Sequence, residues 1–454
     1  MNVSIIGTGY VGLTTGACLA FLGHKVTCLD SDEQKIAMLR AGRTPIYEPF
    51  LNELLAAAQH NLQFCSNYET SIPNAEVIFI AVGTPPSADG RPDLRYLQSA
   101  ARGIGEHFQG DFVVVVNKST VPIGSGNWVG SLVREAWEQT HGRKGGNQFA
   151  VASNPEFLRE GTGLHDSLYP DRVVIGADDD RSLETLYTLY RPILDQTFAP
   201  PPDLPRPEGL GAVPLISTDL ASAELIKYAA NAFLALKISY INEIGQLAEK
   251  VGADIQQVAK GIGLDARIGT RFLQSGIGWG GSCFGKDTAA LVATASEYSL
   301  NMPIVGAARE VNRRQRERVV EKLLVELKIL KGRTVGLLGL AFKPNTDDLR
   351  EAPAVDIIRK LIERGCKVKV HDPVAMERFG NEYRDLSVVP CETPEEVADD
   401  ADALVLVTEW LQYLELDWES VAARMRSRII LDGRNALDRA RLTRFGFRYL
   451  GLGS

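Results

Sequence analysis

The sequence predicts an α/β protein with two doubly wound, Rossmann-like parallel-sheet domains joined by a central helical domain. Near each end of the chain, short β-branched apolar runs alternate with helical patterns. Such alternation is typical of a parallel sheet that is covered by helices on both faces. Between the two stretches lies a helical pattern from Ala221 to about Lys250. It is longer than the average helix of ~11–12 residues, as expected of a spine helix between domains.

The elements follow in order along each stretch. In the first, we expect strands at Asn2–Ile6, Lys25–Leu29, Val77–Val82, Phe112–Lys118 and Phe149–Ser153, and helices at Val11–Leu22, Leu94–Phe108 and Gly126–Gln139. The second runs through Thr334–Leu338, Ala354–Glu363, Lys367–His371, Ala403–Val407 and Arg428–Leu431. Residues 199–214 contain six prolines and predict a linker or surface insertion. The resulting domains are a nucleotide-binding domain at 1–212, a helical domain at 213–325 and a second nucleotide-binding domain at 326–454.

Composition excludes several classes of protein. The chain has 454 residues, of which 45% are hydrophobic and 23% charged, and a net charge of −8. It shows no basic stripe, which argues against nucleic acid as a partner. No apolar run reaches the ~18 residues of a membrane span, and the N-terminus lacks a signal-peptide pattern. Six scattered cysteines without C-x-x-C pairs predict free thiols in the cytoplasm and no metal site.

A glycine loop near the N-terminus predicts a dinucleotide site. Gly7, Gly9 and Gly12 fit the G-x-G-x-x-G pattern and lie between a predicted strand and a predicted helix. Glycines there permit a tight turn and a close approach of the backbone to a pyrophosphate at the helix N-terminus. Asp30 ends the next strand, where its carboxylate can accept hydrogen bonds from the ribose hydroxyls of NAD and would repel the 2′-phosphate of NADP.

One cysteine differs from the others in its surroundings. Cys283 follows a run of glycines, with Ser282 as a plausible N-cap and with Lys286 and Asp287 three and four residues further on. A helix N-terminus favours the thiolate, and residues at these spacings share its face. We therefore expect Cys283 to be a reactive thiol; the alternative is a thiol packed in a glycine-rich turn.

Two further clusters have polar side chains at spacings that would let them act together on a ligand. Glu224, Lys227 and Asn231 share one face of the long helix, where lysine and asparagine can stabilise an oxyanion; a solvated stripe is the alternative. Glu156 and Glu160 follow a strand at the rim where α/β sheets bind ligands. They can act as polar contacts or bases, or form a solvated acidic loop, and spacing alone does not choose between them.

These motifs resemble the nucleotide-sugar dehydrogenase family, which includes UDP-glucose and GDP-mannose dehydrogenases. The similarity covers almost the whole chain and is strongest in the segment that contains Cys283. The matching segments are Gly7–Gly12 with Asp30 and Lys35, Val82–Pro85, Lys118–Pro122, Asn154–Gly161, Tyr169–Val173, Glu224–Asn231, Gly280–Asp287, Ala341–Lys343 with Arg350 and Glu351, and Asp432–Arg434.

The resemblance implies a two-fold oxidation at sugar C6 of UDP-glucose, a small-molecule substrate, to UDP-glucuronate with two NAD+ and one water. It implies that Cys283 is the nucleophile, which carries a thiohemiacetal and then a thioester. Lys227 and Asn231 would stabilise oxyanions, Asp287 and Thr120 would position a water, and Glu160 would be the base for thioester hydrolysis.

The resemblance also implies the binding residues. The cofactor contacts would be Gly7, Gly9, Tyr10, Val11, Gly12, Asp30, Lys35, Thr84, Thr120, Lys286 and Arg350. The substrate contacts would be Glu156, Phe157, Leu158, Arg159, Lys227, Asn231, Phe272, Leu273, Gln274, Ser275, Gly276, Gly280, Phe342 and Lys343. Arg267 resembles a residue that reaches the sugar nucleotide of a neighbouring subunit, so we expect a homodimer or higher oligomer.

Two other functions compete with this interpretation. The first is a related dehydrogenase acting on GDP-mannose, although Tyr169–Val173 and Arg267–Gly269 resemble the UDP-glucose branch. The second is an NAD-binding sensor without catalysis, which would not need Cys283, Lys227, Asn231 and Asp287 together.

Overall fold

The computed structural model describes residues 1–85, 87, 92–142, 144 and 148–453. The chain divides into two compact units, one formed by Met1–Ala229 with Ala289–Glu297 and the other by Ala230–Thr288 with Tyr298–Ser454. Two helices run from one unit into the other, α9 (Leu220–Val251) and α11 (Phe284–Glu297). The three-domain division expected from the sequence therefore stays a prediction.

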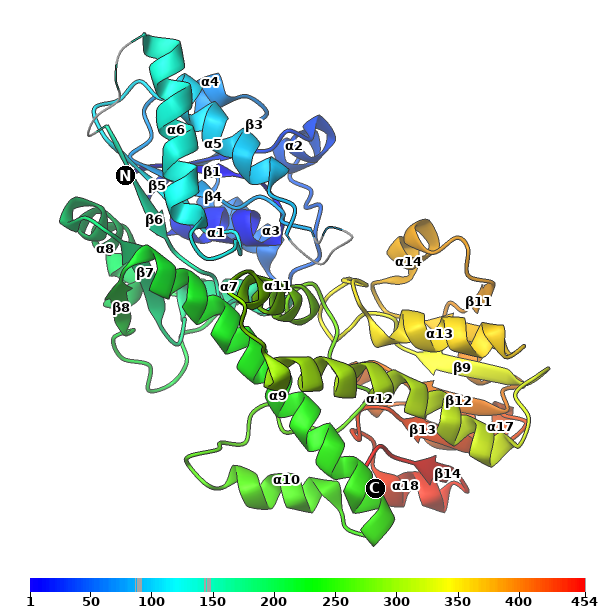
Figure 1. The fold of residues 1–454 in the computed structure, drawn as a ribbon. Coiled ribbons are helices and arrows are strands. Elements are labelled where there is room, and N and C mark those ends of the chain that lie inside the picture. Colours follow the sequence, from blue (N-terminus) through cyan, green and yellow to red (C-terminus); the bar gives the residue numbers. More distant parts are fainter. Residues whose placement is uncertain (86, 88–91, 143, 145–147, 454) are drawn as a thin grey trace. The chain divides into compact units, whose positions relative to one another are not determined.

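The first unit is built on an eight-stranded sheet in the order β3-β2-β1-β4-β5-β6-β7-β8. Its strands are β1 (Asn2–Ile6), β2 (Lys25–Leu29), β3 (Leu62–Cys65), β4 (Val77–Ile80), β5 (Val113–Asn117), β6 (Phe149–Ser153), β7 (Val173–Ala177) and β8 (Leu215–Thr218). Its helices are α1 (Tyr10–Phe21), α2 (Glu33–Arg40), α3 (Leu51–Ala58), α4 (Tyr68–Ser71), α5 (Arg95–His107), α6 (Ser125–His141), α7 (Gly163–Leu168) and α8 (Asp180–Leu194), drawn in blue to green in Figure 1.

Apolar side chains on both faces of this sheet are buried, as expected for a doubly wound sheet. Val114 and Val116 of β5 pack with side chains of α1 and α8 on one face. Val113 and Val115 pack with α5 and α6 on the other. The alternation along β5 follows from the two-residue period of a strand.

The sheet departs from the predicted parallel arrangement at one pair of strands. β7 runs antiparallel to β6, with Ala152 opposite Ala177, and β8 runs parallel to β7. An antiparallel pair needs no crossover to the far end of the sheet, so the connection can remain at one rim. This connection contains residues 154–161, so it lies at the carboxyl end of β6, where α/β sheets bind ligands.

The proline-rich segment 199–214 is packed against the first unit. Tyr169 donates a hydrogen bond from its hydroxyl to the carbonyl of Leu204 at 2.7 Å, and Leu204 itself is buried. Val213 donates to the carbonyl of Leu194, at the end of α8, at 2.8 Å. These contacts fix the segment as an insertion before β8 rather than a free linker.

The second unit contains a six-stranded, fully parallel sheet in the order β11-β10-β9-β12-β13-β14. The strands are β9 (Thr334–Leu338), β10 (Lys367–His371), β11 (Val388–Pro390), β12 (Ala403–Leu406), β13 (Ile429–Asp432) and β14 (Arg448–Leu450). The helices are α10 (Ile255–Gly263), α12 (Pro303–Leu327), α13 (Pro353–Glu363), α14 (Met376–Glu382), α15 (Pro394–Ala398), α16 (Leu411–Leu414), α17 (Trp418–Arg424) and α18 (Arg439–Arg444).

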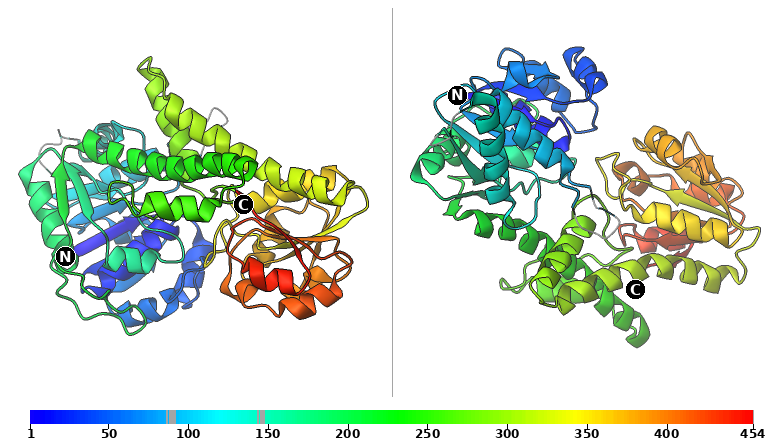
Figure 2. Two further views of the ribbon diagram at one scale, coloured as in Figure 1. Left: turned by 90° about the horizontal axis from the view of Figure 1, so that it is seen from below. Right: turned by 45° about the horizontal axis from the view of Figure 1, so that its top comes forward.

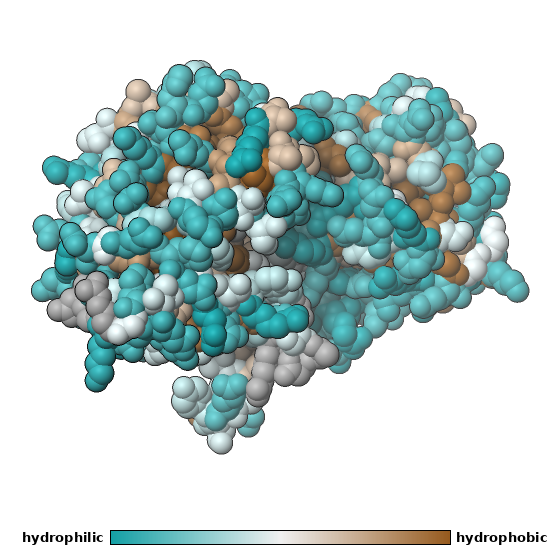
Figure 3. Space-filling view, turned by 90° about the horizontal axis from the view of Figure 1, so that it is seen from above, coloured by the Kyte–Doolittle hydropathy of each residue, from teal (hydrophilic) through white to brown (hydrophobic). Residues whose placement is uncertain are grey.

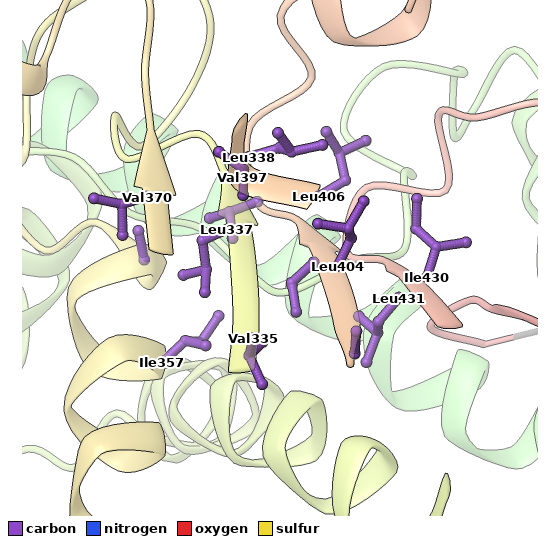
Figure 4. Close-up of a cluster of buried hydrophobic side chains, with 14 of the residues drawn as sticks. Val335, Leu337, Leu338, Ile357, Val370, Val397, Leu404, Leu406, Ile430 and Leu431 are labelled. Carbon is purple, nitrogen blue, oxygen red and sulfur yellow. The ribbon is translucent and has the colours of Figure 1, made fainter. Parts of the chain in front are cut away.

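The core of this unit gathers around its central strands. Figure 4 shows Val335 and Leu337 of β9 on the side of Ile357 from α13, while Leu338 lies near Val397 of α15. Gly336 belongs to the α15 face, because a Cβ there would lie 2.5 Å from the side chain of Val397. Helices thus cover both faces of the second sheet, as the sequence predicts.

The long helix is continuous in Figures 1 and 2 and has 32 residues. None of the helices in the described part of the chain combines the length and apolar character that a bilayer span requires. Hydrophilic side chains cover most of the face shown in Figure 3.

Candidate active site

The glycine loop has the shape that a dinucleotide requires. It follows β1 and opens α1, and Gly7 has a φ of +99°. A Cβ on Gly7 would lie 2.7 Å from the carbonyl oxygen of Ala81, and a Cβ on Gly12 would lie 1.9 Å from that of Gly7. Above Gly9, by contrast, no heavy atom lies within 4 Å of such a Cβ. The outer glycines therefore allow tight packing, and the middle one leaves room for a pyrophosphate.

Asp30 is held at the end of β2 as an ionised carboxylate. Its Oδ2 accepts from the backbone N and the hydroxyl of Thr8, at 2.8 and 2.7 Å, and its Oδ1 accepts from Asp32 N at 3.0 Å. Burial raises the pKa of Asp30, but these hydrogen bonds and the Lys35 ammonium, 4.0 Å away, outweigh it and lower the pKa overall. Asp30 thus fits a contact to the adenosine ribose of NAD.

The loops after β4 and β5 are joined beside the cofactor loop. The hydroxyl of Thr84 donates to the carbonyl of Thr120 at 2.9 Å. The hydroxyl of Ser119 lies 2.7 Å from the carbonyl of Val82. Within the same unit, Tyr10 and Val11 are the first residues of α1. These hydrogen bonds join the loops at the carboxyl ends of β4 and β5. Together with the glycine loop after β1, these loops form the rim of the sheet at which an α/β fold binds a dinucleotide, and their residues fit NAD.

A buried ion pair lies at the start of the long helix. Lys227 donates from Nζ to Glu156 Oε1 at 2.7 Å and to the main-chain oxygen of Glu156 at 2.6 Å. Only 5% of the Lys227 side chain and 7% of the Glu156 side chain are exposed. Glu156 Oε2 also accepts from Leu158 N at 3.0 Å. The structure thus gives Glu156, the first of the two glutamates of this loop, a direct and buried partner in Lys227.

Two cations flank the aromatic ring in the same loop. The guanidinium carbon of Arg172 lies 3.8 Å from the ring centroid of Phe157, and Lys227 Nζ lies 5.6 Å from it. Arg159, next along the loop, pairs with Asp166 at 2.6 Å, and Glu160 is partly buried. The predicted substrate segment is thus fixed on the first unit by several charged contacts.

Glu224 has a structural role that its spacing did not reveal. Its carboxylate accepts from Gly124 N at 2.6 Å and from Gly126 N at 2.9 Å, at the N-terminus of α6. A carboxylate there satisfies free N–H groups and interacts favourably with the helix dipole. Glu224 therefore connects α9 to α6 and does not extend the polar pair of Lys227 and Asn231.

The candidate nucleophile lies immediately before α11. The carbonyl of Cys283 accepts from Asp287 N at 2.8 Å, and the helix begins at Phe284. Cys283 itself, not Ser282 as expected, therefore has the N-cap position, and the Ser282 hydroxyl lies 3.5 Å from its sulfur. Cys283 is partly exposed, whereas the other five cysteines are buried. None of the six cysteines, all of which lie in the described part of the chain, forms a disulfide.

One turn into α11, a buried carboxylate holds an amide and an ammonium. Asp287 Oδ2 accepts from Asn231 Nδ2 at 2.6 Å, and its Oδ1 lies 3.1 Å from Lys286 Nζ. Asp287 has no exposed surface. Asp287 therefore orients the Asn231 amide. Asp287 itself lies in the first turn of α11, four residues after Cys283.

The glycines before Cys283 allow close packing in the second unit. A Cβ on Gly281, whose φ is +86°, would lie 2.8 Å from the ring of Phe342. One on Gly280 would lie 2.5 Å from the carbonyl oxygen of Glu351. Lys343 Nζ lies 5.5 Å from the Phe342 ring centroid. The predicted substrate residues Gly280, Phe342 and Lys343 thus come together.

Arg350 and Arg267 are two predicted contacts near the protein surface. Arg350 pairs with Asp348 at 2.8 Å and is half exposed. Arg267 pairs with Asp265 at 2.6 Å, and 88% of its side chain is exposed. Each guanidinium is therefore held by a neighbouring aspartate, and Arg267 is the more exposed of the two.

A cavity of about 320 Å³ lies in the second unit. It includes Leu273, Gln274 and Ser275 of the predicted substrate segment. Its other lining residues are Ile255, Gln256, Ala259, Lys260, Thr270, Arg434 and Asn435. Phe272, with a φ of +64°, precedes the segment, and Gly276 follows it and donates from N to Asn242 Oδ1 at 2.8 Å.

The sequence assigned no role to the two cations of this cavity, Lys260 and Arg434, although Arg434 lies in the matching segment Asp432–Arg434. Arg434 donates to the carbonyls of Val407, Gly278 and Phe342, at 2.7, 3.2 and 2.9 Å. Its position two residues after β13, at the carboxyl edge of the sheet, was the available signal. Lys260, on α10, carries no comparable signal. Together they give the cavity two cationic side chains, of which Arg434 is also paired with Glu409 at 3.2 Å.

The described residues contain no group of three or more His, Cys, Asp or Glu side chains that could hold a metal ion.

Comparison with known proteins agrees with this division of roles. Residues 1–194 match the NAD binding domain of the UDP-glucose/GDP-mannose dehydrogenase family, residues 221–314 its central domain and residues 336–439 its UDP binding domain.

Full-length relatives share the match. The UDP-glucose 6-dehydrogenase TuaD of Bacillus subtilis is 42% identical over 100% of this chain and 93% of its own. The UDP-glucose 6-dehydrogenase of Rhizobium meliloti is 42% identical over 100% of this chain and 99% of its own. The structure of a UDP-glucose dehydrogenase from Pyrobaculum islandicum, 41% identical, superposes with a TM-score of 0.88 over 99% of this chain and 97% of that one. With its NAD-binding loop, its cysteine at the start of α11 and its full-length relatives, the chain belongs to the UDP-glucose/GDP-mannose dehydrogenase family.

Proposed function

We propose that this chain oxidises the C6 alcohol of UDP-glucose twice, with NAD+ as the oxidant. One UDP-glucose, two NAD+ and one water give UDP-glucuronate, two NADH and three protons. The observation that carries the proposal is the partly exposed Cys283 at the N-cap of α11. One turn further along α11, the buried Asp287 accepts a hydrogen bond from Asn231 of α9. A helix N-terminus favours the thiolate form.

The thiol explains how one site performs two oxidations. The first oxidation gives an aldehyde at C6. Addition of the Cys283 thiolate forms a C–S bond and a tetrahedral carbon that still carries hydrogen. The second oxidation leaves a thioester, and water cleaves its C–S bond to give the carboxylate and the thiol. The aldehyde therefore stays bound to the chain between the two oxidations.

Lys227 and Asn231 are proposed to stabilise the oxygen that becomes negative. They lie four residues apart on α9, so their side chains project from successive turns on one side of the helix. Glu156 fixes the ammonium, and Asp287 fixes the amide. Donors that are oriented before reaction stabilise a developing charge without a cost of reorganisation.

NAD+ supplies the hydride acceptor for both oxidations when it is bound at the glycine loop. The chain contributes the open space above Gly9 for the pyrophosphate and the ionised Asp30 for the ribose. Val11, Lys35, Thr84, Thr120, Lys286 and Arg350 are proposed as further contacts. Thr120 and Asp287 are proposed to position a water that relays protons.

Hydrolysis of the thioester needs a base and an oriented water. Glu160 is the proposed base, because it is partly exposed, whereas Glu156 is buried against Lys227. Glu156, Phe157, Leu158 and Arg159 are proposed to line the sugar site on the same loop.

The nucleotide part of the substrate is proposed to bind in the cavity of the second unit. Leu273, Gln274 and Ser275 offer main-chain groups, and Lys260 and Arg434 offer charge for the diphosphate. Gly280, Phe342 and Lys343 extend the binding surface toward Cys283.

We propose a homodimer as the minimal active unit. Phe233, Tyr240, Leu247 and Val251 lie on one side of α9, at spacings of seven, seven and four residues, and each is at least half exposed. Such an apolar stripe on a helix matches a second copy of the same helix. Arg267 is proposed to reach the sugar nucleotide of the neighbouring subunit.

The deciding experiment is the yield of NADH from a panel of nucleotide sugars, with the mass of each product. UDP-glucose should give two NADH per molecule and a product that is 14 mass units heavier, about the gain for replacing two hydrogens by one oxygen. GDP-mannose should give none. Tight NAD binding without NADH from any sugar would favour the non-catalytic sensor.

A further inference from the structure

A buried carboxylate outside the predicted site connects the cofactor loop to the loop of Glu160. Glu48 lies in the segment before α3 and is 7% exposed. It accepts a short hydrogen bond from the hydroxyl of Tyr10, the first residue of α1. The next residue after Glu48 and Pro49 is Phe50, whose φ of +65° is unusual for a side chain of this size.

The other partners of Glu48 lie in the loop that carries the proposed base. Glu48 Oε2 accepts from Gly161 N at 2.7 Å, and Oε1 accepts from Leu164 N at 3.2 Å. Gly161 N also lies 2.8 Å from the hydroxyl of Tyr10. Glu48 thus binds the peptide group that joins Glu160 to Gly161, so it fixes the backbone directly at Glu160.

Packing leaves this arrangement little freedom. Gly161 has a φ of +80°, which glycine adopts without strain. A Cβ on Gly163 would lie 2.7 Å from the Tyr10 hydroxyl, so the loop is in close contact with the tyrosine. Burial and the neighbouring carboxylates raise the pKa of Tyr10, and Glu160 is one of these carboxylates. The hydroxyl is therefore protonated and near Glu160.

We propose that Glu48 and Tyr10 are positioning residues for thioester hydrolysis: they hold the Glu160–Gly161 peptide, and through it the base, in register with the cofactor loop. This inference rests on the proposed role of Glu160. Neither side chain is proposed to touch the reacting carbon. Loss of either should slow the release of product and leave the two oxidations fast.

The test uses the Glu48→Gln variant of the full chain, whose side chain keeps its size but loses one acceptor. With saturating NAD+ and UDP-glucose, we expect a rapid burst of about two NADH per subunit, followed by a steady rate at least about tenfold below wild type. Intact-protein mass should show an acyl group on Cys283. KM values for both substrates should change by less than about threefold.

Three further variants test whether the effect is specific to the contacts of Glu48. Glu160→Gln should give the same burst and the same acyl-enzyme, and Tyr10→Phe should give a weaker form of both. Tyr47→Phe removes the hydroxyl of the neighbouring, partly exposed tyrosine and should behave as wild type. Hydroxylamine attacks a thioester without a base, so it should restore turnover in Glu48→Gln and yield the UDP-sugar hydroxamate.

The outcomes separate the two proposals. If Glu160→Gln accumulates the acyl-enzyme and neither Glu48→Gln nor Tyr10→Phe does, the positioning role is wrong and the role of Glu160 stands. If Glu160→Gln shows no acyl-enzyme, both roles are wrong. If Glu48→Gln does not fold, Tyr10→Phe decides alone, and a loss of activity without a burst or a hydroxylamine effect would contradict the inference.

Discussion

The ammonium of Lys227 makes two hydrogen bonds to one residue, to the carboxylate and to the main-chain oxygen of Glu156, at 2.7 and 2.6 Å. Both side chains are buried, so neither charge is solvated by bulk water. Each side chain therefore has a hydrogen-bonded counter-charge in the other, and variants of this pair can distinguish a loss of stability from a loss of catalysis.

Lys227→Met should abolish turnover and also destabilise the protein by about 3–5 kcal/mol, because it leaves the Glu156 carboxylate buried without its cation. The double variant Lys227→Met/Glu156→Gln should recover most of the stability and none of the activity. Thermal unfolding and NADH production measure the two effects. A double variant as unstable as Lys227→Met would show that the ion pair is not the source of the loss.

The Asp30 carboxylate should give NAD a preference of at least about tenfold in kcat/KM over NADP, because a partly buried, ionised carboxylate repels the 2′-phosphate. Asp30→Ala should reduce this ratio, with NAD weakened more than NADP. Asp32→Asn is the matched control, because Asp32 caps α2 and does not point to the ribose in this account. Equal kcat/KM values for the two cofactors in the wild type would contradict the role of Asp30.

Lys118 should make stability depend on alkaline pH. Its Nζ donates to Asn154 Oδ1 at 2.8 Å. Burial lowers its pKa to about 8; the Glu156 carboxylate opposes this, and the charge of Lys227 adds to it. Since the unfolded chain has the ordinary, higher pKa, it binds more protons than the folded chain above about pH 8. The cost of burying this charge, of order 3 kcal/mol, is therefore full below pH 8 and is relieved as the pH rises.

The measurement compares the wild type with Lys118→Met by urea unfolding at several pH values from about 7 to about 10. The wild type should gain stability relative to the variant across this range. A constant difference between the two midpoints would show that Lys118 keeps an ordinary pKa in the folded chain.

A shared active site should allow complementation between inactive chains. Arg267→Ala and Cys283→Ala lose different parts of the site, so hybrid dimers would contain one intact site if Arg267 acts across the interface. Mixing the two purified variants should restore part of the activity. Mass spectrometry shows whether hybrid dimers form. Hybrid dimers that form and remain inactive would contradict the assignment of Arg267 to the neighbouring subunit.

The sequence predicted those parts of the molecule whose signals are local. The strands Asn2–Ile6, Lys25–Leu29 and Lys367–His371 were correct to the residue, since each is a short segment that contains β-branched residues. The glycine loop was also found, because its glycines, strand and helix are contiguous. β7 (Val173–Ala177) was not predicted, and its antiparallel direction could not be, because a strand's residues do not encode which way its neighbour runs.

The rest of the site depends on contacts between distant residues. Glu48 had no signal, as its partners Tyr10 and Gly161 lie 38 and 113 residues away. Glu224 shares a helix face with Lys227 by spacing, yet it binds Gly124, 100 residues away. Spacing finds residues that share a face, and only the fold shows which of them meet a partner.

The central claim is that Cys283 carries the substrate between the two oxidations. Cys283→Ser retains an oxygen that can add to the aldehyde, but alkoxide is harder to form than thiolate, and an ester hydrolyses more slowly than a thioester. The variant should therefore perform at most about one turnover and retain a sugar ester on the introduced serine. Cys28→Ser, at a fully buried thiol in β2, should leave catalysis intact.

The most direct measurement is the intact-protein mass of Cys283→Ser after incubation with NAD+ and UDP-glucose. This account predicts an increase by the mass of one UDP-glucuronyl group, located on residue 283 by peptide mapping. An unmodified protein that still makes two NADH per sugar at nearly the wild-type rate would contradict it.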